Sequence, residues 1–249
     1  MRSKILGYLA AFTVLGILAF FGVKADQKAF VGSLYAAFFT ALVAIFVESE
    51  LRPQLRITKE AKPAASADGR RFLHVIVENR VLWWPLRLFM DRRPAYQTRA
   101  WITFLNEMND PIFAEGRRMA GRWANTPEPV RPVSITPDST GKPVATFLLD
   151  LSVTRDAVDI GAGNNEPLDI VMRLPSEDGC RGWHNRMIQR PDTPPEDRFE
   201  LPKGRYHVLV QVESSGRIAQ SLFRIVCDVG IEDFRLELLP GNSRLSKRS

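Results

Sequence analysis

Residues 5–23 read ILGYLAAFTVLGILAFFGV, and after the short segment KADQKA (24–29) residues 30–47 read FVGSLYAAFFTALVAIFV. Neither run contains Asp, Glu, Lys or Arg. A helix of about 17–25 apolar residues crosses a bilayer core that is roughly 30 Å thick. A helix on the surface of a soluble protein would carry a polar stripe, which both runs lack. Residues 1–50 are therefore predicted to form a transmembrane helical hairpin with spans 5–23 and 30–47.

A cleaved signal peptide is the alternative for the first run. Arg2 and Lys4 precede it, and Val23-Lys24-Ala25 has the small-residue character of a cleavage site. The apolar region of a signal peptide is only about 7–15 residues long, however, which is shorter than this run. Two spans are therefore favoured.

The distribution of basic residues predicts the orientation. The side shared by the two ends of the hairpin carries Arg2, Lys4, Arg52, Arg56, Lys59 and Lys62. The connecting segment carries only Lys24 and Lys28. Because Lys and Arg flanking membrane spans concentrate on the cytoplasmic side, both termini and the C-terminal domain are predicted to be cytoplasmic, at an inner or plasma membrane. The two cysteines are then expected to be reduced.

Small residues recur along the second run at intervals of four. They are Gly32, Ala36, Thr40 and Ala44. Such a stripe lets another helix approach closely in lipid, so these residues are predicted to pack against a helix. Two partners remain open: the first span, or the same stripe in a second copy, which would make a homo-oligomer.

The chain beyond the hairpin is predicted to be all-β. Residues 51–70 are expected to form a juxtamembrane linker, 71–240 a β domain and 241–249 a flexible tail. Apolar residues alternate with polar ones in several segments, which is typical of strands with one buried face. These segments lie near residues 73–77, 100–104, 147–151, 168–172, 206–212, 223–227 and 234–238. An antiparallel β-sandwich of about 7–9 strands is predicted, with a hairpin turn at 214–216 and long proline-rich loops over 126–143 and 185–203.

The last long strands carry a resemblance to a known superfamily. Leu201, Gly204, Tyr206, Val208 and Val210, followed by a hairpin, resemble the closing strands of immunoglobulin-like and fibronectin-type sandwiches. The resemblance implies that Tyr206 occupies the place of the corner tyrosine. Val208 stands where an immunoglobulin domain has its second cysteine, so the resemblance extends to shape and not to the disulfide or to an activity.

Motifs for catalysis, cofactors and metals are missing. The formal net charge is +6, and only two cysteines and three histidines are present. No HExxH, GxSxG, CxxC or complete phosphate-binding loop occurs. Cys180 and His184 could form a nucleophile and base, but four-residue spacing in a loop does not establish that geometry. No catalytic residue, metal site or cofactor is therefore predicted.

Three segments combine arginine with aromatic residues, at 83–93, 117–125 and 181–186. Arginine pairs with phosphate or carboxylate, and tryptophan offers a stacking face. If the segments meet, they would bind an anionic, nucleotide-like ligand. The alternatives are packing in the core and contact with lipid headgroups; nucleic acid is disfavoured by the diffuse charge. The candidate ligand-binding residues are Trp83, Trp84, Arg87, Arg92, Arg93, Arg118, Arg122, Trp123, Trp183 and His184.

The sequence as a whole predicts a non-catalytic, membrane-anchored binding or scaffold protein. Its partners are the lipid bilayer and an unidentified protein or anionic ligand. The alternative is an effector whose β domain senses an anionic nucleotide-like signal and whose spans oligomerise to disrupt the membrane. This two-span, β-rich layout is similar to effectors of bacterial cyclic-oligonucleotide defence systems. An enzyme whose residues are scattered along the chain is the third class.

Overall fold

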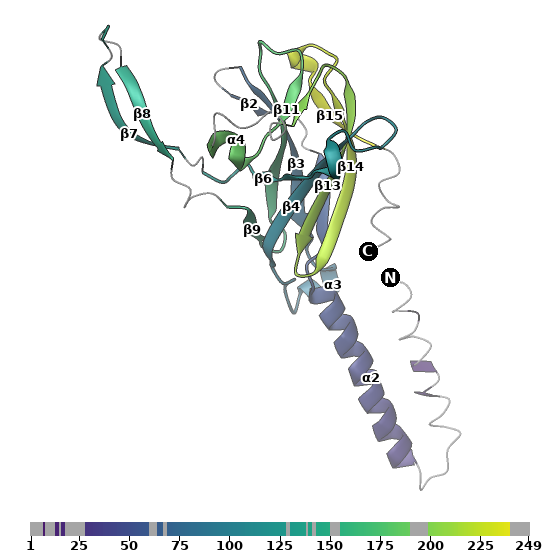
Figure 1. Cartoon of the computed structure of the whole chain (residues 1–249). Coiled ribbons are helices and arrows are strands. Elements are labelled where there is room, and N and C mark those ends of the chain that lie inside the picture. Colours follow the sequence, from purple (N-terminus) through teal and green to yellow (C-terminus); the bar gives the residue numbers. More distant parts are fainter. Residues whose placement is uncertain are drawn as a thin grey trace. The chain divides into compact units, whose positions relative to one another are not determined.

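The computed structural model describes residues 7, 13–14, 16–17, 28–59, 64–66, 69–127, 130–137, 139–140, 143–149, 155–189 and 199–239 (Figure 1). The chain divides into two compact units. One consists of Met1–Arg52 and Leu82–Arg93, and the other of Pro53–Val81 and Pro94–Ser249. The predicted tail, 241–249, lies outside the described residues.

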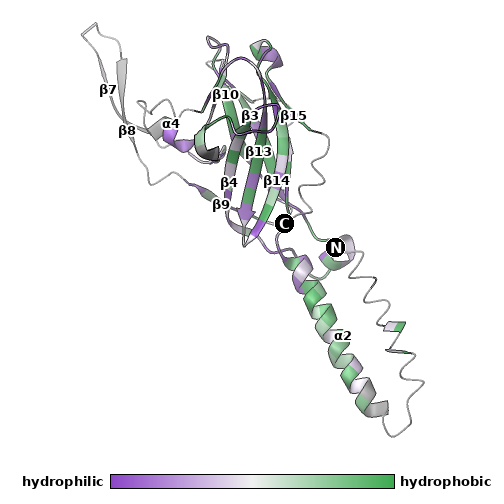
Figure 2. Ribbon diagram, turned by 45° about the vertical axis from the view of Figure 1, so that its right-hand side comes forward, coloured by the Kyte–Doolittle hydropathy of each residue, from purple (hydrophilic) through white to green (hydrophobic). Residues whose placement is uncertain are grey.

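Helix α2 (Lys28–Leu51) dominates the first unit and contains all of the second predicted span. Its segment Gly32–Leu51 is long and apolar enough to cross a membrane. Large apolar side chains such as Phe30, Leu34 and Ile45 are exposed on it, and it is coloured mostly as hydrophobic in Figure 2. This helix is the one candidate span among the described residues. The first predicted span, 5–23, lies outside them except for five helical residues, so the hairpin remains a prediction.

Two features of α2 bear on helix packing: the surroundings of Tyr35 and the exposure of the small-residue stripe. A Cβ atom added at Gly16 would overlap the ring of Tyr35, so the backbone at Gly16 approaches this side chain as closely as only glycine allows. Ala36, Thr40 and Ala44 of the small-residue stripe are exposed. The helix that covers this stripe stays a prediction.

The second unit contains two antiparallel sheets, as the alternating pattern predicted. The first has the order β1-β3-β10-β11-β12, with β2 paired to β3 and β6 paired to β10. Its strands are β1 (Leu55–Lys59), β2 (Ala64–Ala65), β3 (Arg71–Asn79), β6 (Arg122–Trp123), β10 (Asn165–Arg173), β11 (Cys180–Gly182) and β12 (Glu200–Leu201).

The second sheet has the order β15-β14-β13-β4-β5, with β9 paired to β4. Its strands are β4 (Ala95–Leu105), β5 (Met119–Ala120), β9 (Ala157–Ile160), β13 (Arg205–Ser214), β14 (Arg217–Val226) and β15 (Arg235–Leu238). A separate two-stranded sheet pairs β7 (Val130–Pro137) with β8 (Pro143–Leu149). The described helices of this second unit are α4 (Asn185–Gln189) and the 3-10 turns Ala114–Gly116 and Ile231–Asp233. Helix α3 (Trp84–Arg87) belongs to the first unit.

One hydrophobic core contains residues from both large sheets. Val75 and Leu168 of the first sheet and Ile102, Val210 and Phe223 of the second are all at most 1% exposed and belong to one cluster. Hydrophobic and polar residues alternate along β13 and β14 in Figure 2, as expected of strands with one face on a core. The fold is therefore compatible with a β-sandwich.

The predicted turn at 214–216 is present. Ser214 pairs with Arg217, and Ser215 and Gly216 between them have φ values of 50° and 71°. Positive φ at both central residues is the feature of the type I′ turn, whose twist matches that of the flanking strands. The turn thus fixes the register of the longest hairpin, β13–β14.

Other segments differ from the prediction. Strand β1 lies inside the predicted linker and pairs with β3 along its whole length, because the chain enters the sheet within a few residues of α2. Strand β7 lies inside the predicted proline-rich loop, since proline favours extended backbone and is tolerated at sheet edges. The two large sheets hold seven and six strands, more than the predicted 7–9, because several strands are only two or three residues long.

Candidate functional site

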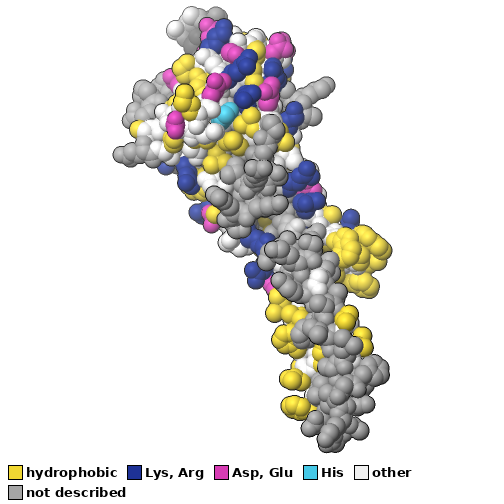
Figure 3. All heavy atoms as spheres, turned by 90° about the vertical axis from the view of Figure 1, so that its right-hand side faces the viewer, with side chains coloured by type: hydrophobic (Ala, Val, Ile, Leu, Met, Phe, Trp, Pro, Cys, Tyr) yellow, Lys and Arg dark blue, Asp and Glu magenta, His cyan; other side chains and the backbone are white. Residues whose placement is uncertain are grey.

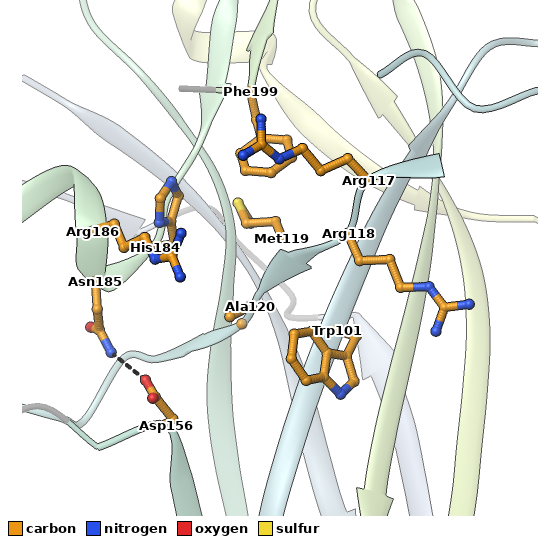
Figure 4. Close-up of a pocket in the computed structure, with 11 residues that line it drawn as sticks. Trp101, Arg117, Arg118, Met119, Ala120, Asp156, His184, Asn185, Arg186 and Phe199 are labelled. Atoms are coloured by element: carbon orange, nitrogen blue, oxygen red, sulfur yellow. Dashed lines mark hydrogen bonds between the residues drawn. The ribbon is translucent and has the colours of Figure 1, made fainter. Parts of the chain in front are cut away.

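Two of the three arginine–aromatic segments meet at a cavity of about 300 Å³ in the second unit. Residues 117–121, which lead into and form β5, provide one wall, and residues 184–186, which begin α4, provide another. Trp101 of β4 and Phe199, next to β12, complete the lining. Figure 4 shows these side chains around the opening.

The charges around the cavity are mainly positive. Arg117, Arg118 and Arg186 line it, all three are exposed, and Asp156 is the one acidic residue among the lining residues. Asp156 accepts a long hydrogen bond of 3.4 Å from Asn185 Nδ2. In Figure 4 Arg117 points toward Phe199, whereas Arg118 extends away from His184. The field at this opening therefore favours an anion.

An aromatic cluster supports the inner side of the cavity. The Phe199 ring lies 5.1 Å from Phe113, 6.0 Å from Phe104 and 5.6 Å from the His184 ring, measured between centroids. Phe199 itself has a φ of 49°, in the left-handed region that a bulky residue rarely adopts. Such a conformation costs on the order of 1–3 kcal/mol and persists only where the surroundings hold it, as these three rings do.

A glycine lets the two walls of the cavity approach each other. A Cβ atom added at Gly182 would lie 2.5 Å from Met119 Sδ and 2.9 Å from Phe199 Cβ. Any larger residue on β11 would push apart the β5 and Phe199 sides. The local packing of the site thus depends on the absence of a side chain at this position.

Asn185 adds a polar group to the cavity lining. Its side chain is buried at 8% exposure, and its Oδ1 atom has no hydrogen-bond partner among the described residues. A buried acceptor without a partner is unfavourable by about 1–3 kcal/mol. A bound molecule with an N–H or O–H group could satisfy it.

The predicted site residues of the β domain fall into two groups. Arg118 and His184 line the cavity. Trp123 and Trp183 are buried at 0% and 9% exposure, and Trp183 packs edge-on against Phe72 at 5.7 Å. The burial of these two tryptophans agrees with the alternative of packing in the core.

Arg122 is also interior, which agrees with the same alternative. It is 5% exposed, and its Nη1 donates to Asp169 Oδ2 at 2.5 Å. Its Nη2 donates to the carbonyl oxygen of Thr126 at 3.1 Å. The guanidinium charge of Arg122 is therefore paired with Asp169 inside the domain.

The third predicted segment does not belong to this site. Trp83, Trp84, Arg87, Arg92 and Arg93 all lie in the unit that contains α2. Trp83, Trp84, Arg87 and Arg93 are exposed, and Arg92 is buried at 2%.

Six of the lining residues described above were absent from the predicted set: Trp101, Arg117, Asp156, Asn185, Arg186 and Phe199. Trp101 carried a usable signal, because it is an aromatic residue at an outward position of an alternating strand, flanked by buried Ala100 and Ile102. Arg117 and Arg186 lay in the segments already noted. Phe199 gave no such signal, since its place depends on contacts between distant parts of the chain.

The suggested pairing of Cys180 with His184 is replaced by a pair of thiols. Cys180 of β11 and Cys227, which follows β14, are both buried and free. The pKa of Cys180 is raised well above its ordinary value, chiefly by a hydrogen bond with Cys227 and secondly by burial. The same hydrogen bond lowers the pKa of Cys227. A thiol with a raised pKa is a poor nucleophile. Among the described residues no group of three or more His, Cys, Asp and Glu side chains could hold a metal ion.

No family model, no curated protein and no solved structure matches this chain.

Proposed function

We propose that this chain is a non-catalytic, membrane-anchored binding protein whose β domain holds a small anionic ligand in the cavity between residues 117–121 and 184–186. One observation carries the proposal: three exposed arginines from two separate segments line the same opening, and a single aspartate is the one acidic residue that lines it with them. Like charges brought together by the fold repel each other, and a bound anion removes that repulsion.

The lining also favours a ligand with a planar part. Trp101, 36% exposed, supplies an aromatic surface next to the arginines, the buried Phe199 supports the inner wall, and Asn185 supplies a hydrogen-bond acceptor. Phosphate or carboxylate would pair with the guanidinium groups, and a base or another flat ring would stack. The volume of about 300 Å³ lies at the small end of ligand sites, which span roughly 300–1,000 Å³. A nucleotide-like molecule combines these features.

We further propose an immunoglobulin-like arrangement for the domain. Four strands of the first sheet lie side by side in the order β1-β3-β10-β6. Three strands of the second sheet lie side by side in the order β4-β13-β14. This order supports the proposal, because an immunoglobulin-type sandwich has the strand order A-B-E-D in one sheet and C-F-G in the other. Tyr206 Oη donates to the carbonyl oxygen of Pro202 at 2.9 Å, as a corner tyrosine does. Eight further strands among the described residues are additions to that plan: β2, β5, β7, β8, β9, β11, β12 and β15.

Thermal unfolding of the full chain in detergent micelles tests the ligand site. The panel contains inorganic phosphate, citrate, adenine and guanine mononucleotides, and cyclic dinucleotides. A ligand that binds only the folded state raises the free energy of unfolding by about 2.7 kcal/mol at a hundredfold excess over its Kd. We expect at least one anion to raise the unfolding midpoint with increasing concentration.

Matched arginine variants locate the effect. Arg117→Gln and Arg186→Gln should each weaken binding about tenfold or more, because a hydrogen bond to a charged group contributes about 1.5–3 kcal/mol. Arg217→Gln, which removes the same charge from an exposed position outside the cavity lining, should leave binding unchanged. A panel without any stabilising anion, or equal binding by all three variants, would contradict the proposal.

An effector is the second candidate, favoured by the exposed small residues Ala36, Thr40 and Ala44 of α2. Such a stripe can drive association of spans in lipid. A Cβ at Gly32 meets nothing within 4 Å, so Gly32→Leu fits the described part of the chain while it blocks close approach of another helix. If the chain is an effector, overexpression arrests growth and Gly32→Leu relieves the arrest; normal growth with the unaltered chain argues against this candidate.

A further inference from the structure

The segment Leu82–Arg93, between β3 and β4, exposes a set of large apolar side chains. Trp83 is 48% exposed, Trp84 70%, Leu88 71% and Phe89 82%. They lie on and around the single turn α3, whose first bond runs from the Leu86 N–H to the Trp83 carbonyl oxygen at 3.0 Å. Figure 3 shows hydrophobic side chains gathered in one yellow patch beside the upper part of the helix. Contiguous apolar surface of this kind marks a site of contact with a partner or a membrane.

Arg93 attaches this segment to the C-terminal end of α2. Its two Nη groups donate to the two carboxylate oxygens of Glu48, each at 2.8 Å. Its backbone N–H donates to the carbonyl oxygen of Leu51 at 2.9 Å. The last carbonyl groups of a helix have no partner within the helix, so Arg93 supplies one from outside.

Arg92 makes a second, buried attachment. Its guanidinium is fully buried, its Nη1 donates to the carbonyl oxygen of Arg52 at 2.7 Å, and its Nη2 lies 3.8 Å from Glu50 Oε2. Glu48 and Glu50 are the acidic residues nearest the apolar part of α2. Pairing with Arg92 and Arg93 neutralises both carboxylates where a charge close to hydrocarbon would be most unfavourable.

The attachment fixes the level of the segment along α2. The candidate span Gly32–Leu51 has 20 residues, which at about 1.5 Å per residue is roughly 30 Å, the thickness of a hydrocarbon core. Since Glu48 and Glu50 lie in the last turn of this segment, the boundary between hydrocarbon and headgroups lies just after Val47, and Leu51 is about one turn beyond that boundary. Because Arg93 is bonded to Leu51, the adjoining segment starts close to that boundary, where tryptophan side chains are enriched in membrane proteins.

We infer that residues 83–89 lie in the headgroup layer of the bilayer that α2 crosses, with lipid covering Trp83, Trp84, Leu88 and Phe89. The exposed Arg87 is placed to pair with lipid phosphate. The segment acts as a second membrane contact, which sets the depth and rotation of α2. The inference rests on the proposed anchoring by α2 and is independent of the ligand cavity.

Tryptophan fluorescence of the full chain in phosphatidylcholine vesicles tests this contact. The five tryptophans are at positions 83, 84, 101, 123 and 183, so neither predicted span contributes to the signal. Lipids brominated on their acyl chains quench only tryptophans that touch them. We expect quenching of up to about two-fifths of the emission, the share of Trp83 and Trp84, and bromines close to the headgroup should quench more than deep ones.

Two variants assign the signal. The double variant Trp83→Phe and Trp84→Phe should lose the quenched fraction, and Trp101→Phe, which alters an exposed tryptophan of the β domain, should retain it. Unquenched tryptophans in a chain that floats with the vesicles would overturn the inference, as would equal quenching in the double variant. If Trp83 and Trp84 escape quenching by brominated lipid only at a high protein-to-lipid ratio, a second copy of the chain covers this surface. A chain that does not float with vesicles would also contradict the proposed anchoring by α2.

Discussion

Arg122 and Asp169 form a buried ion pair in which Arg122 Nη1 lies 2.5 Å from Asp169 Oδ2. The other carboxylate oxygen, Asp169 Oδ1, lies 2.7 Å from His74 Nε2. The pair joins β6 to β10, and Arg122 is opposite Asp169 in the register of these strands. It therefore holds the short strand β6, directly after the cavity-lining residues 117–121, to the first sheet.

Asp169→Asn should strongly destabilise the β domain. The change leaves the guanidinium of Arg122 buried without a counter-charge, and breaking such a pair costs about 3–5 kcal/mol. Urea unfolding of the full chain in detergent measures the difference. Glu213→Gln, at an exposed position of β13, is the control and should change stability by less than about 0.5 kcal/mol. Equal stability of the two variants would show that the ion pair is not required.

The stability of the β domain should fall as the pH drops below about 6.5, the ordinary pKa of histidine. Burial, and secondly the charge of Arg224, lower the pKa of His207 in the folded state. Between the two values the unfolded chain binds more protons than the folded one, so the free energy of unfolding decreases with decreasing pH. His207→Gln should flatten this part of the pH profile in urea unfolding. An unchanged profile would contradict the assignment to His207.

Both thiols should be inert in the folded chain. Cys180 is 3% and Cys227 0% exposed, and the raised pKa of Cys180 leaves little thiolate. Titration with Ellman's reagent should detect neither thiol under native conditions and two in denaturant. Rapid reaction of either thiol without denaturant would be inconsistent with the packing around β11 and β14.

Because both native cysteines are buried, they should contribute little background when introduced cysteines are labelled to test the orientation of the chain in the membrane. Met108 is 84% exposed on the β domain, and Lys28 begins α2 at its predicted outer end. In intact cells a membrane-impermeant maleimide should label Lys28→Cys, and it should label Met108→Cys only after permeabilisation. The reverse pattern would place the β domain outside the cytoplasm and refute the prediction from basic residues.

The elements predicted well are those whose pattern is long. Strand β13 buries Val208, Val210 and Val212 in strict alternation, and α2 is apolar throughout. Strand β1 was not predicted. Ile57 is the only buried residue among its five, so its sequence shows no alternation of buried and exposed residues. Its place is fixed instead by pairing with β3.

The site was predictable only in part. The sequence indicated the arginine-rich segments, but it could not distinguish Arg118, which lines the cavity, from Arg122, which is buried four residues later. That difference arises from the pairing of β6 with β10, a contact between residues more than forty positions apart. Likewise, Trp101 and Phe199 reach the same cavity only because the sheets bring them together.

Anchoring by α2 underlies the membrane display of the ligand cavity, the orientation of the domain and the lipid contact of residues 83–89. Extraction of membranes with alkaline sodium carbonate, followed by high-speed sedimentation, tests it most directly. This treatment strips peripheral proteins and leaves proteins with membrane spans in the pellet. We predict that the full chain stays in the pellet and moves to the supernatant only with detergent. A full chain released by carbonate alone would contradict a transmembrane α2.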